Sequence, residues 1–130
     1  MENELAIQEE NVVALVEGRE LGDVLKPLIK EIHLFDSYVA GTTHLEDASV
    51  LQSIRVGDSL TLRREVNRYD DNAIVIMDEE KRTVGYVPEK DNTVFARLMD
   101  AGKLLKARIT KIEDRGPMKQ IAIGIYLVDY

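Results

Sequence analysis

The sequence contains no cysteine, which excludes disulfide bonds and thiolate metal ligands. His33 and His44 are the only nitrogen ligands that remain. No apolar run approaches the roughly 20 residues that a membrane-spanning helix needs, and the N-terminus is acidic where a secretory signal peptide is basic. We therefore expect a cytoplasmic protein with no membrane partner, no metal site and no cofactor.

The motifs of large enzyme classes are also missing. Gly41-Thr42-Thr43 is too short to form a Walker-type phosphate loop, and the sequence contains no nucleophile elbow. A metal-dependent nuclease would need His44 together with Asp70 and Asp71. Adjacent residues in a strand point to opposite faces, so these two carboxylates would share a site only through a turn. We therefore expect no catalytic residue and no enzyme activity.

The charge is unevenly distributed along the 130 residues, whose net charge is −7. Residues 1–23 hold seven acids and one base, a net charge of −6, whereas the other 107 residues hold 17 acids and 16 bases. The body of the chain is therefore nearly neutral. This excludes a broad basic surface but is compatible with a local basic site. The length corresponds to one domain with a sizeable core.

Apolar periodicity predicts a mainly β fold. The expected strands cover residues 28–40, 59–65, 73–77, 83–87, 104–112 and 120–128, and the expected helices cover 3–17, 47–54 and 91–101. Hairpin links predominate, which favours a small six-stranded, mostly antiparallel, OB-like β-barrel with two short helices. We expect residues 1–29 to form an acidic helical extension and residues 30–130 to form the barrel. The N-terminal helix is compatible with packing on the domain or with binding a partner or second copy.

Several residues carry local predictions. Asp47 or Glu46 is expected to cap the helix over 47–54, and Asp91 is expected to cap the helix that ends at Gly102. Val94 is expected on the buried face of that helix, with Phe95, Leu98 and Met99. Gly124, in the middle of the last strand, is expected to mark a bulge or a sharp bend.

A polar loop, Asn67–Asn72, connects two predicted strands and is unusually rich in functional groups. Arg64 and Arg68 could bind phosphate, because guanidinium groups form two parallel hydrogen bonds to it. Tyr69 offers a ring for base stacking, which contributes about 1–3 kcal/mol per base. Asp70 could accept the proton of a sugar hydroxyl. A carboxylate repels a phosphodiester but tolerates a free 3′ hydroxyl, so this loop favours a strand end.

The same residues also fit purely structural roles. Arg64 could pair with a carboxylate at the rim of the barrel, Tyr69 could cap the core, and Asp70 could bond loop amides. The residue types alone leave both interpretations open.

Four segments in this order resemble the HIRAN domain, and the resemblance spans about residues 30–128. The segments are Tyr38–His44, Gly57–Glu65, Asn67–Ile74 and Val84–Pro88. The resemblance implies a compact β-barrel, related to oligonucleotide-binding barrels, that binds single-stranded DNA at free 3′ ends. Such domains occur fused to Snf-type remodelling ATPases in replication-fork repair, or alone in bacteria. This chain carries no ATPase motif and therefore resembles the stand-alone bacterial kind.

The resemblance also implies site residues. It places the end-binding loop on Asn67, Tyr69 and Asp70, with Tyr69 stacking on the terminal base and Asp70 accepting the 3′ hydroxyl. By the same correspondence, Tyr86 and Lys90 line the pocket.

The loop after Gly41 would form the opposite wall of the pocket. DNA-binding relatives carry an arginine and two aromatic residues there, whereas this chain has Thr43, His44 and Leu45. One imidazole thus replaces two large rings. An alternative of a different class is a protein-interaction or scaffold module that acts with a helicase, other ATPase or nuclease partner.

Overall fold

The computed structural model describes residues 30–116 and 118–129, so the predictions for residues 1–29 lie outside the described residues. In chain order the elements are β1 (Lys30–Tyr38), η2 (Thr42–His44), η3 (Ala48–Gln52), β2 (Ser59–Arg64), β3 (Ile74–Met77), β4 (Thr83–Tyr86), α3 (Glu89–Asp100), β5 (Leu104–Arg115) and β6 (Met118–Asp129). The two η elements are short 3₁₀ helices.

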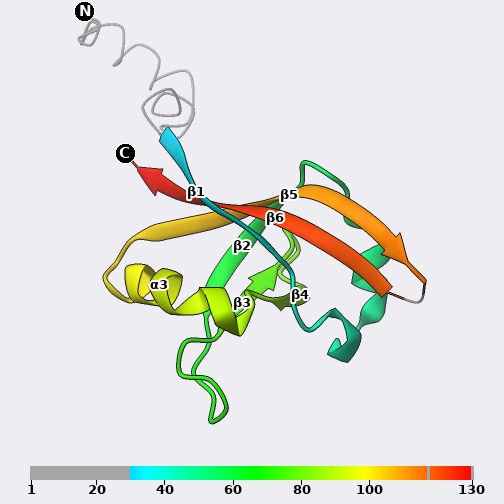
Figure 1. The fold of residues 1–130 in the computed structure, drawn as a ribbon, viewed down its shortest axis with the longest axis horizontal. Helices are drawn as coiled ribbons and strands as arrows, with labels where there is room; N and C mark the ends of the chain where they lie inside the picture. The colour runs from blue at the N-terminus through cyan, green and yellow to red at the C-terminus, as the bar shows by residue number, and fades with distance from the viewer. Residues whose placement is uncertain (1–29, 117, 130) are drawn as a thin grey trace, which may run out of the picture. The chain divides into compact units, whose positions relative to one another are not determined.

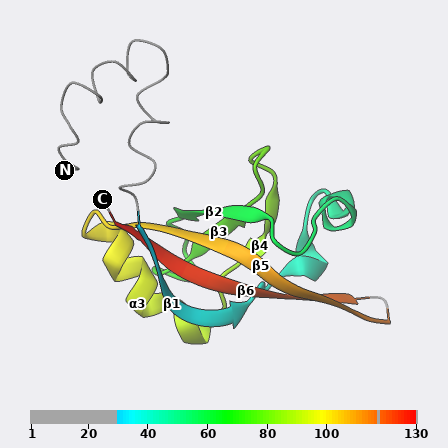
Figure 2. The same cartoon turned by 90° about the horizontal axis from the view of Figure 1, so that it is seen from above.

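The six strands form one sheet in the order β1-β6-β5-β2-β3-β4. The pairs β2–β3, β2–β5, β3–β4 and β5–β6 are antiparallel, and β1 runs opposite to β6 (Figure 1). The views in Figures 1 and 2 show that the sheet is strongly curled. This confirms the mainly β, antiparallel fold.

In the part of the chain that the structure describes, the edges of the curled sheet are bridged at one residue pair, Ala40 and Tyr86, which we call the closing bridge. The Ala40 N–H donates to the Tyr86 carbonyl at 2.7 Å, and the Tyr86 N–H donates to the Ala40 carbonyl at 2.8 Å. One residue pair does not make a continuous ladder. Over the described residues the fold is therefore a half-barrel with one α-helix and two 3₁₀ turns, where we predicted a barrel with two short helices.

Gly85 permits the close approach at the closing bridge. A Cβ atom on Gly85 would lie 2.4 Å from the Ala40 carbonyl oxygen and 2.4 Å from the Val39 Cγ1 atom. Real contacts are never this short, so a side chain at this position would push the continuation of β1 away from β4. The absence of a side chain is what brings the two edges together.

One face of the sheet carries the core. Side chains alternate between the faces of a strand, and the buried set follows this period in β2, β5 and β6. It includes Leu60, Leu62, Ile74, Ile76, Leu105, Ala107, Ile109, Ile121, Ile123 and Ile125. Phe95 and Ala96 of α3 pack against the same cluster. Burying each large aliphatic side chain contributes about 1.5–3 kcal/mol.

The start of α3 differs from the prediction. Pro88 is the N-cap residue, and Asp91 lies in the first turn of the helix. Proline supplies a suitable φ angle and has no N–H group that would need a partner. The Asp91 carboxylate instead accepts a hydrogen bond from the Ser37 hydroxyl at 2.7 Å, which ties α3 to β1.

The buried face of α3 is also narrower than predicted. Phe95 is buried and Leu98 and Met99 are partly buried, but 63% of Val94 is exposed. Val94 precedes Phe95 by one residue and is therefore rotated about 100° away from it on the helix surface. The predicted end of the helix at Gly102 is confirmed, with a φ of 94° and an N–H that donates to the Met99 carbonyl at 3.0 Å.

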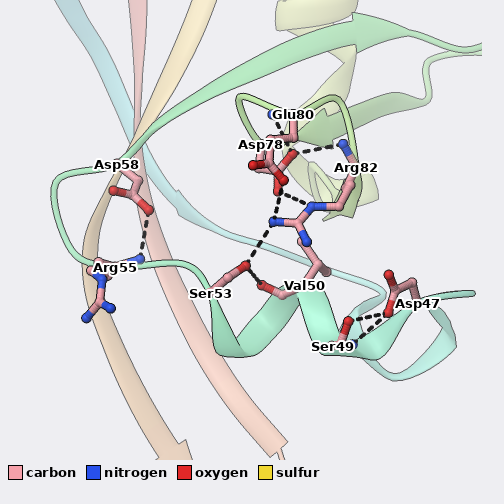
Figure 3. Close-up of polar contacts among 9 residues, drawn as sticks. All are labelled: Asp47, Ser49, Val50, Ser53, Arg55, Asp58, Asp78, Glu80 and Arg82. Atoms are coloured by element: carbon pink, nitrogen blue, oxygen red, sulfur yellow. Dashed lines mark hydrogen bonds and ion pairs between the residues drawn. The ribbon is translucent and has the colours of Figure 1, made fainter.

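The predicted helix over 47–54 is the shorter 3₁₀ helix η3, and Asp47 caps it. The β3–β4 turn is fastened to this helix by Arg82 (Figure 3). The Arg82 Nε donates to Asp78 Oδ2 at 2.8 Å, and Nη2 donates to the Ser53 hydroxyl at 3.0 Å. Asp78 is only 8% exposed and also accepts from the backbone N–H groups of Glu80 and Arg82.

Gly124 does not mark a bulge. The irregularity in the β5–β6 ladder lies between Ile109 and Lys111, whereas Gly124 pairs in regular register with Arg108. A Cβ atom at Gly124 would lie 3.0 Å from Cε1 of Tyr126, so the tyrosine ring covers the glycine. Within the described residues, no helix combines the length and hydrophobicity that a membrane crossing requires.

Candidate nucleic-acid interface

The side chain of Asn67 organises the loop between β2 and β3. Its Oδ1 accepts hydrogen bonds from the backbone N–H groups of Tyr69 at 2.9 Å and Asp70 at 2.8 Å. Its Nδ2 donates to Oε2 of Glu65 at 3.1 Å. Asparagine forms such local turns readily because its short amide reaches nearby main-chain groups. Asn67 therefore gives the loop its shape and places Tyr69 and Asp70 side by side.

The Asp70 carboxylate is held from two directions. Oδ1 accepts from the backbone N–H of Asn72 at 2.9 Å, and Oδ2 accepts from Nδ2 of Asn92 at 2.8 Å. Asn92 belongs to α3 and is 2% exposed. Each carboxylate oxygen can accept a second hydrogen bond. Asp70 is thus oriented in advance and still has the capacity to bind a hydroxyl group.

Tyr69 presents its ring to solvent, with 84% of the residue exposed. The guanidinium carbon of Arg68 lies 5.9 Å from the centre of this ring, within the range of a cation–π contact. Tyr69 therefore does not cap the core. Its ring is available for stacking, and Arg68 places a positive charge beside it.

Tyr86 contributes the other side of the site from β4. Its hydroxyl donates to the Glu65 carboxylate, with distances of 3.0 and 3.1 Å to the two oxygens. Burial, followed by the hydrogen bond to Glu65 and that residue's negative charge, raises the pKa of the Tyr86 phenol above its ordinary value of 10.0. The phenol is therefore neutral at physiological pH, and Glu65 fixes its direction.

These side chains line one open groove, which we call the end groove, with a volume of ≈ 400 Å³. Its lining residues are Ala40, Gly41, Asn67, Tyr69, Asp70, Ala73, Tyr86, Val87 and Glu89. The set contains the carboxylates of Asp70 and Glu89 but neither lysine nor arginine. Such a lining suits a ring and a hydroxyl group better than a phosphate.

Four of the predicted site residues meet in the end groove: Asn67, Tyr69, Asp70 and Tyr86. Others lie elsewhere. His44 lines a neighbouring cavity of ≈ 610 Å³, which shares Gly41 and Tyr86 with the groove. Thr43 lines a third cavity of ≈ 350 Å³. Lys90 lines an apolar cleft of ≈ 440 Å³ between β1 and α3.

Arg64 has a structural role. Its Nε donates to Asp100 Oδ1 at 2.9 Å, and its Nη atoms donate to the carbonyls of Ala73 at 2.6 Å and Asp71 at 2.7 Å. Arg64, the last residue of β2, therefore ties the β3 end of the loop to the end of α3. This is the ion pair at the rim that the sequence left open as an alternative.

Glu65, Glu89 and Asn92 shape the site and were not predicted. Asn92 carries no local signal because its partner Asp70 is 22 residues away in the chain. Glu65 immediately follows the end of β2, where loop ligands concentrate, and Glu89 is the first residue of α3. Within the described residues, no group of three or more His, Cys, Asp or Glu side chains is arranged to hold a metal ion.

Comparison with known proteins decides the family. The HIRAN domain profile matches residues 32–127, which is most of the chain. The chain belongs to the HIRAN domain family. A search of curated proteins finds no match.

Two solved structures resemble this HIRAN domain. A crystal structure of a protein from Lactobacillus plantarum has a TM-score of 0.72 and 27% identity, covering 78% of this chain and 99% of that chain. The HIRAN domain of human HLTF has a TM-score of 0.60 and 15% identity, covering 75% of this chain and 78% of that chain. The half-barrel is thus a HIRAN fold, as the resemblance of the four segments predicted.

Proposed function

We propose that this HIRAN domain binds single-stranded DNA at a free 3′ end, in DNA repair or replication, without catalysing a reaction. The terminal base stacks on Tyr69, and its 3′ hydroxyl donates to Asp70. The observation that carries the proposal is the exposed Tyr69 ring beside a carboxylate that two hydrogen bonds already orient in the end groove.

Charge explains why the end groove would prefer a hydroxyl to a phosphate. Asp70 and Glu89 both line it, and a terminal phosphate would bring up to two negative charges beside them. A hydroxyl instead donates to an acceptor that is already in place, so binding requires little reorganisation. In this proposal the Arg68 guanidinium, whose carbon lies 5.9 Å from the centre of the Tyr69 ring, binds a phosphate of the same strand.

The end groove provides one strongly exposed ring, that of Tyr69, because Tyr86 is only partly exposed and His44 lines another cavity. Base stacking on one ring contributes about 1–3 kcal/mol. We therefore expect weak binding by the end groove alone and a strong dependence on Tyr69 and Asp70.

Fluorescence anisotropy at low salt tests the proposal with three oligonucleotides: one with a free 3′ hydroxyl, one with a 3′ phosphate and one closed as a hairpin. We expect binding to the first, with loss on Asp70→Ala. Asp71→Ala is the matched control, because it removes the same charge from an exposed neighbour whose contact with Arg64 uses only its backbone carbonyl. Absence of binding below the high-micromolar range, with or without residues 1–23, would exclude the function.

A second candidate function is a protein-interaction module that acts with a helicase or nuclease. The cleft between β1 and α3 favours it, since Phe35 is 40% exposed and Val94 is 63% exposed. On this alternative, Val94→Asp weakens binding of a purified helicase or nuclease partner and leaves oligonucleotide binding unchanged. Loss of oligonucleotide binding on Asp70→Ala favours the first function instead.

A further inference from the structure

Lys106 and Arg108, two of the cations of β5, lie on the face of the sheet opposite the core. Lys106 pairs across the ladder with Tyr126 of β6 and Thr61 of β2, and Arg108 pairs with Gly124 of β6. Side chains two residues apart on a strand point to the same face and start about 7 Å apart. Lys106 and Arg108 therefore form a short row of positive charge on the outer face.

A single carboxylate bridges these two cations. Glu31 of β1 pairs through Oε2 with the Lys106 ammonium, and Arg108 Nη2 donates to its Oε1 at 3.0 Å. The hydrogen bond from Lys106 is the main reason that the pKa of Glu31 lies below its ordinary value. The side chains of Glu31, Lys106 and Arg108 are 32%, 26% and 35% exposed, so solvent reaches all three. Two oxygens of one anion thus bind two cations, as two oxygens of a phosphodiester can.

An aromatic ring lies beside the cations. The guanidinium carbon of Arg108 is 5.3 Å from the centre of the Tyr126 ring. The His33 ring contacts the Tyr126 ring edge-on, with 5.3 Å between the two ring centres. The ring occupies the space above Gly124, where a Cβ atom would collide with it. An aromatic side chain next to a row of cations is the combination that single-strand binding surfaces use.

The outer face continues from the end groove. Val75 of β3 pairs with Tyr86 of β4 on one side and with Arg63 of β2 on the other, so Tyr86 and Arg63 point to the same face. Thr61 follows on this face and pairs with Lys106. Arg63 is exposed and lies between Tyr86 and the β5 cations along this route.

We propose that Lys106, Arg108 and Tyr126 form a second binding site for the backbone of a single strand, and that Glu31 is an intramolecular competitor for it. A phosphodiester replaces the Glu31 carboxylate on the two cations, and a base stacks against the Tyr126 ring. The inference rests on the proposed function in one respect, that the ligand is single-stranded nucleic acid. We call this cluster the outer-face site.

Strand length tests the outer-face site. A strand of about three nucleotides with a free 3′ hydroxyl reaches only the end groove, whereas one of about 12 nucleotides reaches both sites. Lys106→Ala/Arg108→Ala should leave the short strand unaffected. For the long strand it should lower the salt slope of log K by about 1.4, because each phosphate contact on a single strand contributes about 0.7. Arg97→Ala/Lys103→Ala is the control, since it removes the same charge from two exposed positions outside the sheet.

Glu31→Gln tests the inference by an increase in affinity, which misfolding of the variant would not produce. It removes the competing charge and should raise affinity for the long strand about two- to fivefold, which corresponds to an exposed ion pair of about 0.4–1 kcal/mol. The short strand should be unaffected. An unchanged or lower affinity for the long strand in Glu31→Gln, with an unchanged salt slope in the double variant, would overturn the inference.

A long strand with a 3′ phosphate separates the two proposals. If the end-groove proposal is wrong and the outer-face proposal is right, the long strands with a 3′ hydroxyl and with a 3′ phosphate bind with equal affinity. Both then bind more weakly to Lys106→Ala/Arg108→Ala. If the outer-face proposal is wrong and the end-groove proposal is right, only strands with a 3′ hydroxyl bind. The double variant then has the same affinity as its control variant.

Discussion

The end groove and the outer-face site use opposite chemistry. Asp70 in the groove is held by neutral amide donors from Asn72 and Asn92, and the lining contains no cation. Lys106 and Arg108 on the outer face are held by the charge of Glu31. Hydrogen bonds from neutral amides to a carboxylate pair no opposite charges and depend little on salt, whereas exposed ion pairs are screened by it.

Because of this difference, the end groove suits discrimination between ligand groups, whereas the outer-face site suits general attraction of phosphate. A groove whose lining holds two carboxylates and no cation repels a terminal phosphate and can therefore distinguish it from a hydroxyl group. A row of cations binds any phosphate along a strand and does not distinguish one from another. On the two proposals, these regions bind different parts of one strand, its end and its length, and variants that damage one region should spare the other.

A pair of glycine substitutions should separate the regions most strongly. Gly85→Ala places a methyl group 2.4 Å from the Ala40 carbonyl and should destabilise the fold by roughly 3 kcal/mol, the upper end for overpacking. It should also disrupt the groove wall at Ala40 and Gly41. Urea unfolding and binding of the short strand measure both effects.

Gly124→Ala is the counterpart on the outer face. Its methyl group would meet the tip of the Tyr126 ring, which can rotate away, so the stability loss should be smaller, about 1 kcal/mol. The long strand should bind less tightly and the short strand as before. Equal stability losses in the two variants would contradict the assignment of Gly85 to the closing bridge.

Asn92→Ala should have the next largest effect. It removes the buried donor to Asp70 and should cost about 2 kcal/mol, because the half-buried carboxylate loses a partner. Binding of the 3′ hydroxyl should weaken while the salt slope for the long strand is unchanged. Thermal unfolding and anisotropy measure these effects. Asn72→Ala is the control, since its side chain makes only a 3.4 Å contact with Thr93.

Arg64→Lys tests whether this arginine is structural. An ammonium group cannot reproduce the fork that joins Asp100 to the carbonyls of Ala73 and Asp71. We expect a loss of about 1 kcal/mol of unfolding free energy, because the Arg64 side chain is only 18% exposed. The salt slope for both strands should be unchanged, and a lower slope would instead show that Arg64 contacts phosphate.

Tyr86→Phe should have the smallest effect and should depend on pH. The folded-state pKa of Tyr86 is raised, so its contribution to stability is present below pH 10 and is lost as the pH rises through the folded-state pKa. The variant should therefore show a flatter loss of stability above pH 10 than the parent. Urea midpoints across this range measure the difference, and parallel curves would contradict it.

The strands could be predicted because their signals are local. β-branched runs and period-2 alternation identify β2, β3, β5 and β6 directly, and the Asp47 cap spans only two residues. Tyr69 and Asp70 were predicted from residue type together with the HIRAN resemblance. The chain order alone could not give the contact that holds Asp70 from α3, because Asp70 and Asn92 lie 22 residues apart.

The opposite wall was harder to predict for a related reason. Thr43 and His44 belong to a 3₁₀ turn that follows Gly41, whose φ is +75°. The direction of a side chain after such a left-handed residue depends on one backbone angle. The incomplete barrel likewise depends on how closely Ala40 approaches Gly85, a distance that no local pattern encodes.

The closing bridge has a kinetic consequence. The Ala40 and Tyr86 amide protons bond only to each other's carbonyls across the gap between the two sheet edges, so local opening exposes both at once. Ala40 and Tyr86 also line the end groove. The rate at which these two amides exchange with deuterium therefore reports how often the groove itself comes apart. A ligand bound in the end groove should slow the exchange of both amide protons together.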